Sequence, residues 1–173
     1  MKKLVVVTVL AIGISSGIFA QEKIKWEMNS NDELESVNNF EYSSFENGEF
    51  SGKTKYDPCI FLKLPAKEIN SSDYNILKVR LYSSATFDFL DFFYSSPNKE
   101  WCIGAADVKV EQGWKEYTID LTNVKWRAAE ASSADAAKWG GTTGKVSGLR
   151  IDPGNEAGRI VKVDWVELSK GKL

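Results

Sequence analysis

Three tryptophans stand where an indole ring could meet a ligand: Trp101, Trp126 and Trp139. A flat aromatic face can stack on the C–H patches of a sugar ring, while carboxylates, amides and guanidinium groups bond its hydroxyls. Trp101 begins the extended run 101–110, in which most apolar residues have even numbers, so its ring is predicted to point outward. Trp126 and Trp139 flank segment 127–138 and are predicted to line a pocket at a loop end. Because tryptophan is highly buried on average, packing is the alternative for all three.

Polar side chains that could bind the same kind of ligand are Arg80, Tyr82 and Asp88. All three have outward parity on runs expected to be neighbouring strands, so they predict a hydrogen-bonding sheet face. A merely solvated face is the alternative, because antiparallel sheets often expose one side to water. The remaining tryptophans fall on apolar parities or at strand starts and are predicted to pack: Trp26, Trp114 and Trp165.

Catalytic machinery is hard to assemble from this composition. The chain has no histidine, which is the commonest general base and zinc ligand. It also lacks a nucleophile elbow, a phosphate-binding loop and a Cys-x-x-Cys motif. Paired carboxylates can hydrolyse glycosides, but among 24 acidic residues some pair always has the required separation. We therefore predict a protein that is not a self-sufficient enzyme, with a small carboxylate-based carbohydrate-active enzyme as the remaining catalytic alternative.

Two residue pairs are candidates for structural links. Cys59 and Cys102 are the only cysteines, and an oxidising compartment would permit one disulfide. Two buried thiols that pack as small apolar groups are the alternative, because sequence does not fix the distance between their Cα atoms. Arg150 and Asp152 lie two residues apart, hence on one face of an extended run, and predict a structural ion pair.

The elements that must position these residues are short extended runs separated by turn residues. The clearest is 75–82, where Leu77, Val79 and Leu81 alternate with polar residues, as in a half-buried strand. Asn47-Gly48 is a strong hairpin signal. Pro58 lies at the start of a run, where its missing N–H is tolerated. The expected strands are 22–28, 38–44, 57–64, 75–82, 86–94, 101–110, 115–121, 147–152 and 159–168.

Many short strands without a long helical pattern favour an all-β sandwich or barrel. A parallel α/β sheet would need helices between its strands. The one helix candidate is Arg127–Lys138, which is rich in alanine and is predicted to be a short surface helix or a loop. We find no internal repeat, and residues 21–173 have a length typical of one domain.

Seven segments together resemble the galactose-binding-like jelly-roll domains attached to secreted bacterial carbohydrate-active proteins. The most specific are Gly-Trp-x-x-Tyr-x-Ile-Asp-Leu, then Trp-Gly-Gly, Leu-Arg-x-Asp-Pro and Val-Asp-Trp-Val-x-Leu, in the order and near the spacing of that family. The stretch 126–138 looks like an insertion, and 22–44 matches weakly. The segments are 45–62, 76–84, 87–96, 113–121, 139–141, 148–154 and 161–168.

The resemblance implies an antiparallel jelly-roll β-sandwich of about eight strands that contacts glycans. Related jelly rolls often hold a structural calcium ion between the N-terminal segment and the last strand. Asp164 matches the last-strand acid and Glu27 is the nearest early candidate, since calcium takes six to eight oxygen ligands. No other cofactor is implied. The predicted function is a non-catalytic glycan-binding module, with a structural or protein-interaction sandwich of the cell envelope as the alternative.

The first twenty residues have the pattern of a secretory signal peptide. Lys2 and Lys3 precede an apolar run, and Ala20 gives a small residue at the expected cleavage point. Removal of the two lysines lowers the net charge from −2 to −4, which disfavours nucleic acids and anionic membranes as partners. We expect export to the periplasm or medium, without membrane insertion, and partnership with glycans or with a carbohydrate-active or envelope protein.

Overall fold

The computed structural model describes residues 23–87, 90–98, 101–105, 108–128 and 138–171. This part of the chain is antiparallel β structure with one 3-10 turn, Asn31–Glu33, and it contains no α-helix. It likewise contains no helix that is long and apolar enough to cross a membrane. The predicted leader, Asp88 and most of the predicted helix Arg127–Lys138 lie outside the described residues, while Arg127 itself belongs to a strand.

Twelve strands make up the fold of the described residues. In chain order they are β1 (Lys23–Trp26), β2 (Leu34–Glu46), β3 (Glu49–Leu62), β4 (Ile69–Asn70), β5 (Ile76–Ser83), β6 (Asp91–Ser95), β7 (Trp101–Ala105), β8 (Gly113–Asp120), β9 (Lys125–Ala128), β10 (Lys145–Val146), β11 (Gly148–Asp152) and β12 (Ile160–Ser169).

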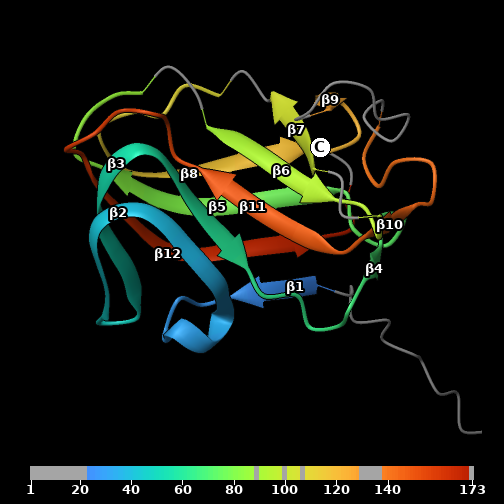
Figure 1. Cartoon of the computed structure of the whole chain (residues 1–173), viewed down its shortest axis with the longest axis horizontal. Helices are drawn as coiled ribbons and strands as arrows, with labels where there is room; N and C mark the ends of the chain where they lie inside the picture. Colours follow the sequence, from blue (N-terminus) through green and yellow to red (C-terminus); the bar gives the residue numbers. More distant parts are fainter. Residues whose placement is uncertain (1–22, 88–89, 99–100, 106–107, 129–137, 172–173) are drawn as a thin grey trace, which may run out of the picture.

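Ten of these strands form one curled antiparallel sheet with the order β8-β5-β12-β3-β11-β6-β7-β9, with β1 beside β12 and β2 beside β3. Strands β4 and β10 pair separately. The curl brings β12, β5 and β8 opposite β11, β6 and β7, so that the sheet makes both layers of a sandwich (Figure 1). The predicted all-β antiparallel sandwich is therefore confirmed.

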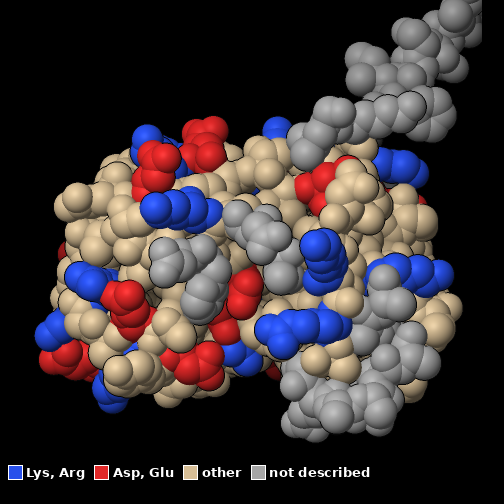
Figure 2. All heavy atoms as spheres, turned by 90° about the horizontal axis from the view of Figure 1, so that it is seen from above, with Lys and Arg blue, Asp and Glu red and all other residues tan. Residues whose placement is uncertain are grey.

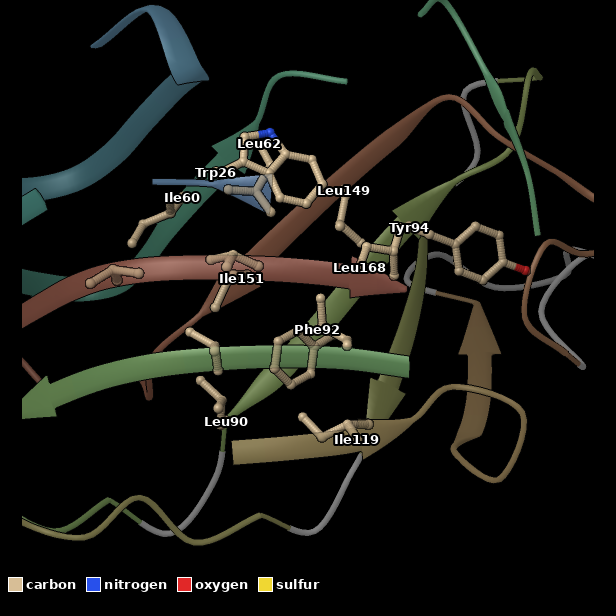
Figure 3. Close-up of a cluster of buried hydrophobic side chains, with 14 of the residues drawn as sticks. Trp26, Ile60, Leu62, Leu90, Phe92, Tyr94, Ile119, Leu149, Ile151 and Leu168 are labelled. Carbon is tan, nitrogen blue, oxygen red and sulfur yellow. The ribbon is translucent and has the colours of Figure 1, made fainter. Parts of the chain in front are cut away.

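The hydrophobic core lies between the two layers. Figure 3 shows Phe92 and Tyr94 from β6 meeting Ile119 from β8 and Leu168 from β12. Every second residue of β5 points inward, and Leu77, the first of them, is fully buried, as period-two alternation predicts. Each layer therefore has one face on the core and one outer face.

Strands β2 and β3 form a long hairpin (Figure 1). Its turn is Asn47-Gly48, where both residues have positive φ (56° and 78°), as a type I′ turn requires. The β2–β3 register has no pairs between Thr54 and Cys59, and Pro58 lies in this irregularity, where no ladder hydrogen bond is lost. Asp57, just before it, has φ 54°.

Candidate functional site

A row of side chains crosses the outer surface of β3, β11 and β6. Arg150 pairs in register with Phe61 on one side and Phe93 on the other. Its guanidinium carbon lies 4.3 Å from the Phe93 ring centroid and 5.5 Å from that of Phe61. Both rings therefore attract the cation and limit its movement. We call the outer surface formed by Phe61, Phe93, Trp101, Arg150 and Asp152 the Arg150 face.

Two carboxylates hold the guanidinium of Arg150. Asp152 accepts a hydrogen bond from Nε at 2.6 Å and a second from Nη2, which is the bidentate geometry that suits an arginine–carboxylate pair. Asp57 accepts from Nη2 at 3.4 Å across the irregularity of β3. The predicted Arg150–Asp152 ion pair is therefore present, and the positive φ of Asp57 brings a second carboxylate to it.

The two carboxylates differ in burial. The Asp152 side chain is 5% exposed, whereas that of Asp57 is 68% exposed. Desolvation raises the pKa of Asp152 to about 6, against the opposing effect of Arg150 and with a further rise from the Asp57 and Asp91 carboxylates. Asp57 is therefore the acid on this face that is open to a ligand, while Asp152 fixes the guanidinium.

Trp101 lies at the other end of the Arg150 face. It is partly exposed, at the start of β7, and its ring meets Phe61 edge-on at 5.5 Å between centroids. The indole reaches over β11 at Gly148, where an added Cβ would come within 3.1 Å of its Cη2 atom. Absence of a side chain at Gly148 thus makes room for the ring. The predicted outward position of Trp101 is what the structure shows.

Trp126 and Trp139 instead pack in the core, which corrects the prediction that they line a pocket. They are 8% and 6% exposed and stack on each other at 5.6 Å, with Tyr94 edge-on to both. The indole N–H of Trp126 donates to the Leu121 carbonyl at 2.8 Å, and that of Trp139 donates to the Tyr74 carbonyl at 2.6 Å. These rings close the end of the sandwich and offer no face to a ligand.

Arg80 and Tyr82 lie together on the outer surface of β12, β5 and β8, away from Trp101. Arg80 lies over the ring of Trp114 at 4.9 Å and pairs with Asp164, and Tyr82 lies 5.7 Å from the same ring. We call this surface, with Trp165, the Arg80 face. Arg80 and Tyr82 thus share an outer surface, as predicted, on the layer opposite the Arg150 face, and Asp88 lies outside the described residues.

Trp114 and Trp165 are partly exposed, so the prediction that both pack in the structure was wrong. The register of β12 shifts between Val163 and Trp165, and this β-bulge turns Trp165 to the outer surface. Trp114 shares its parity with the polar residues Glu116 and Thr118, a signal that was visible in the sequence. Of the predicted packing tryptophans only Trp26 is buried, at 3% exposure.

Two exposed tyrosines were not among the predicted site residues. Tyr42 and Tyr56 are 52% and 76% exposed. Tyr56 directly precedes Asp57, so its backbone lies at the rim of the Arg150 face. Large exposed rings carry information because most large apolar side chains are buried, and Tyr56 is the more exposed of the two.

Cys59 and Cys102 are both buried thiols, with no bond between them. Cys59 is on β3 and Cys102 on β7, and β11 and β6 lie between these strands. Three inter-strand spacings amount to about 14 Å along the sheet, whereas bridged Cα atoms lie within about 7 Å. The disulfide alternative is therefore wrong. Burial raises the pKa of Cys59 to about 11, which leaves its thiol protonated and unreactive.

Glu27 and Asp164, the predicted calcium ligands, each face a basic side chain. Glu27 pairs with Lys25 at 2.9 Å, and Asp164 pairs with Arg80. Across the described residues, no group of three or more acidic, histidine or cysteine side chains is suited to a metal. This donor set does not fit calcium as the side chains lie, and any ion would depend on backbone carbonyls.

Comparison with known proteins identifies the class of fold. No protein-family model and no curated protein matches the sequence. A lysine-to-alanine variant of the carbohydrate-binding module CBM29-2, complexed with cellulohexaose, superposes with a TM-score of 0.55 at 7% identity, covering 88% of this chain and 94% of that one. A tyrosine-to-alanine variant of the same module gives 0.56 at 8% identity, covering 87% and 94%.

The chain therefore has the β-sandwich fold of carbohydrate-binding modules. A third similar structure, PfGH50B, gives a TM-score of 0.60 at 13% identity over 88% of this chain. The match covers 24% of that longer chain, so the likeness concerns one part of it. At these identities the comparisons define the fold, and function must be inferred from the side chains.

Proposed function

We propose that this chain is an exported, non-catalytic glycan-binding module and that the Arg150 face is its binding surface. The observation that carries the proposal is the partly exposed indole of Trp101 beside a fixed Arg150 and an exposed Asp57. Such a set offers a ring for the C–H face of a sugar and charged groups for its hydroxyls. The likeness in fold to a carbohydrate-binding module complexed with cellulohexaose supports glycan binding as the function.

The charges on this face favour a neutral glycan. Arg150 is already paired with Asp152 and Asp57, and Asp91 on β6 lies beside Asp152 in register. A sugar carboxylate or sulfate would be repelled by these three carboxylates, because the guanidinium of Arg150 is already paired with two of them. Neutral hydroxyls can instead share the outer lone pairs of Asp57.

Calorimetry tests the proposal with cellohexaose, mannohexaose, xylohexaose and a uronic-acid hexasaccharide. We expect the wild-type protein to bind at least one neutral hexasaccharide. Trp101→Ala should lower the affinity about tenfold or more, because a buried stacking contact contributes on the order of 1–2 kcal/mol. Arg150→Lys keeps the charge but loses the bidentate pair with Asp152, and it should weaken binding also. Tyr42→Ala removes an exposed ring outside the Arg150 face and is the matched control.

Two outcomes reject the proposal. The first is a wild-type protein that binds no sugar of the panel at millimolar concentration. The second is binding that survives Trp101→Ala and Arg150→Lys unchanged. In the first case a structural or protein-interaction sandwich becomes the better interpretation. Release of reducing ends from a polysaccharide would instead support the enzyme alternative.

Export belongs to the same proposal and has its own test. The predicted signal peptide 1–20 should be removed on secretion, so that the mature protein begins at Gln21. Mass spectrometry of the protein from the periplasm or medium measures this directly. A full-length protein that retains residues 1–20 would contradict it.

A further inference from the structure

We propose that the Arg80 face is a second glycan-binding surface, so that one domain holds two neutral polysaccharide chains on opposite sides. The inference rests on the proposed function, because it assumes that aromatic and paired charged groups on this fold serve sugar binding. It adds a separate site on the outer surface of β12, β5 and β8. The core shown in Figure 3 lies between this layer and the one that carries the Arg150 face.

The side chains of the Arg80 face are neighbours by strand register. Trp165 on β12 lies opposite Arg80 on β5, and Tyr82 on β5 lies opposite Trp114 on β8. The guanidinium carbon of Arg80 is 4.9 Å from the Trp114 ring centroid, and the Tyr82 ring is 5.7 Å from it. Three partly exposed rings therefore surround one arginine on a single surface.

This arrangement repeats the chemistry of the Arg150 face with different residues. On each face an arginine lies over an aromatic ring, an aspartate pairs with that arginine, and a partly exposed tryptophan stands beside them. A sheet face that is merely solvated has no need of two tryptophans and a tyrosine, whose burial would stabilise the fold by a few kcal/mol each. The Arg80 face leaves part of that stabilisation unused, because all three rings remain partly exposed.

The bulge in β12 is an independent observation that points to the same surface. Val163 pairs with Leu81 and Trp165 with Arg80, so Asp164 is an extra residue in the strand. Without the bulge, regular alternation from the buried Val163 through Asp164 would turn Trp165 into the core. The bulge turns the indole outward, and its extra residue, Asp164, supplies the carboxylate that pairs with Arg80. Bulges that re-aim a side chain in this way are common beside functional sites.

Charge on the Arg80 face is balanced, which favours a neutral polyhydroxylated ligand. Four ion pairs cross the surface: Lys23–Glu167, Lys25–Glu27, Arg80–Asp164 and Lys162–Glu49. A nucleic acid or an acidic polymer needs an excess of basic groups, and these pairs leave no such excess. Basic and acidic side chains are likewise interspersed on the surface seen in Figure 2.

The test compares stoichiometry and cross-linking. Calorimetry with the best hexasaccharide from the neutral panel should give two sugars bound per wild-type chain. Trp114→Ala and Trp165→Ala should each weaken one of the two sites at least tenfold and leave the other unchanged, and Trp101→Ala should do the reverse. Tyr42→Ala is again the control, because it removes an exposed ring on β2, outside the Arg150 face and the Arg80 face.

Bivalency gives a second readout. Wild-type protein mixed with soluble glucomannan should raise the turbidity of the solution by bridging chains, and Trp114→Ala should abolish the rise. If Trp165→Ala does not fold, Tyr82→Ala on the same face replaces it. One bound hexasaccharide per chain that is insensitive to Trp114→Ala overturns the second surface and leaves the proposed function intact. A wild-type chain that binds no glycan rejects both.

Discussion

Gly148→Ala should weaken glycan binding by displacing Trp101 without touching a ligand-contacting side chain. An added Cβ would lie 2.6 Å from Ser95 Oγ and 3.1 Å from Trp101 Cη2, whereas carbon contacts are optimal at about 3.5–4.0 Å. The indole must therefore shift by several tenths of an ångström. Ser95 is buried and bonded to Ser147 Oγ at 3.1 Å, so it cannot simply move away. Gly148 does not have positive φ, so its backbone accepts alanine and the effect comes from contact alone.

The expected magnitude follows from overpacking, which costs about 1–3 kcal/mol in stability. The displaced indole should in addition weaken binding about tenfold, which equals about 1.4 kcal/mol of binding free energy. Urea unfolding measures the first quantity and calorimetry with the best neutral hexasaccharide measures the second. Far-ultraviolet circular dichroism confirms that the variant retains its strands.

Gly104→Ala is the matched control, on strand β7 of the same layer. Its added Cβ would lie 2.7 Å from Trp126 Cζ3 and 2.8 Å from Val124 Cγ1, on the core side of the same layer. This variant should lose a similar amount of stability and keep wild-type affinity. The reasoning is refuted if Gly148→Ala binds like the wild type, or if Gly104→Ala weakens binding to the same extent.

Four further predictions concern the buried rings, the buried acid, the thiols and calcium. Trp139→Ala removes a buried stacked ring and should lower the free energy of unfolding by about 3–5 kcal/mol, while affinity measured on the folded protein stays at the wild-type value; a large loss of affinity would return Trp139 to the binding site. Burial raises the folded-state pKa of Asp152 to about 6 from 3.8, so the folded state binds the proton of this carboxyl more tightly than the unfolded state. The free energy of unfolding should therefore increase as pH falls from 7 to 4, and this contribution is lost as pH rises through 6. The unfolding free energy of wild type minus that of Asp152→Asn should thus grow by up to about 3 kcal/mol on acidification, and a difference that shrinks would contradict the burial argument. Cys59 and Cys102 should both be alkylated in denaturant without reductant, whereas resistance to alkylation would reveal a bridge. Because Glu27 and Asp164 are paired with Lys25 and Arg80, the melting temperature in millimolar calcium should equal that in a chelator, and a higher melting temperature in calcium would show a bound structural ion.

The sandwich could be predicted from the sequence because its strands alternate cleanly. The period-two pattern of 75–82 places inward the residues Leu77, Val79 and Leu81 that the structure buries, and Asn47-Gly48 marks the hairpin turn. Strands β4, β9 and β10 were not predicted. They are two to four residues long, too short for alternation to show above chance.

The candidate site was predicted only in part. Trp101 and the Arg150–Asp152 pair were visible, because parity over two or three residues is local information. The stacking of Phe61 and Phe93 on Arg150 depends on the register of three strands that are distant in the sequence. Trp165 was misplaced because one extra residue, Asp164, inverts the parity of the strand that follows. Neither register nor a bulge can be determined from composition and periodicity.

The most direct measurement follows the tryptophan indole N–H signals in proton–nitrogen correlation NMR spectra while the neutral hexasaccharides are titrated into the protein. The indoles of Trp26, Trp126 and Trp139 donate to backbone carbonyls inside the protein and should keep their chemical shifts. The signal of Trp101 should move and saturate with the sugar. Saturating binding that shifts the three buried indoles and leaves Trp101 unmoved would contradict the assignment of glycan binding to the Arg150 face.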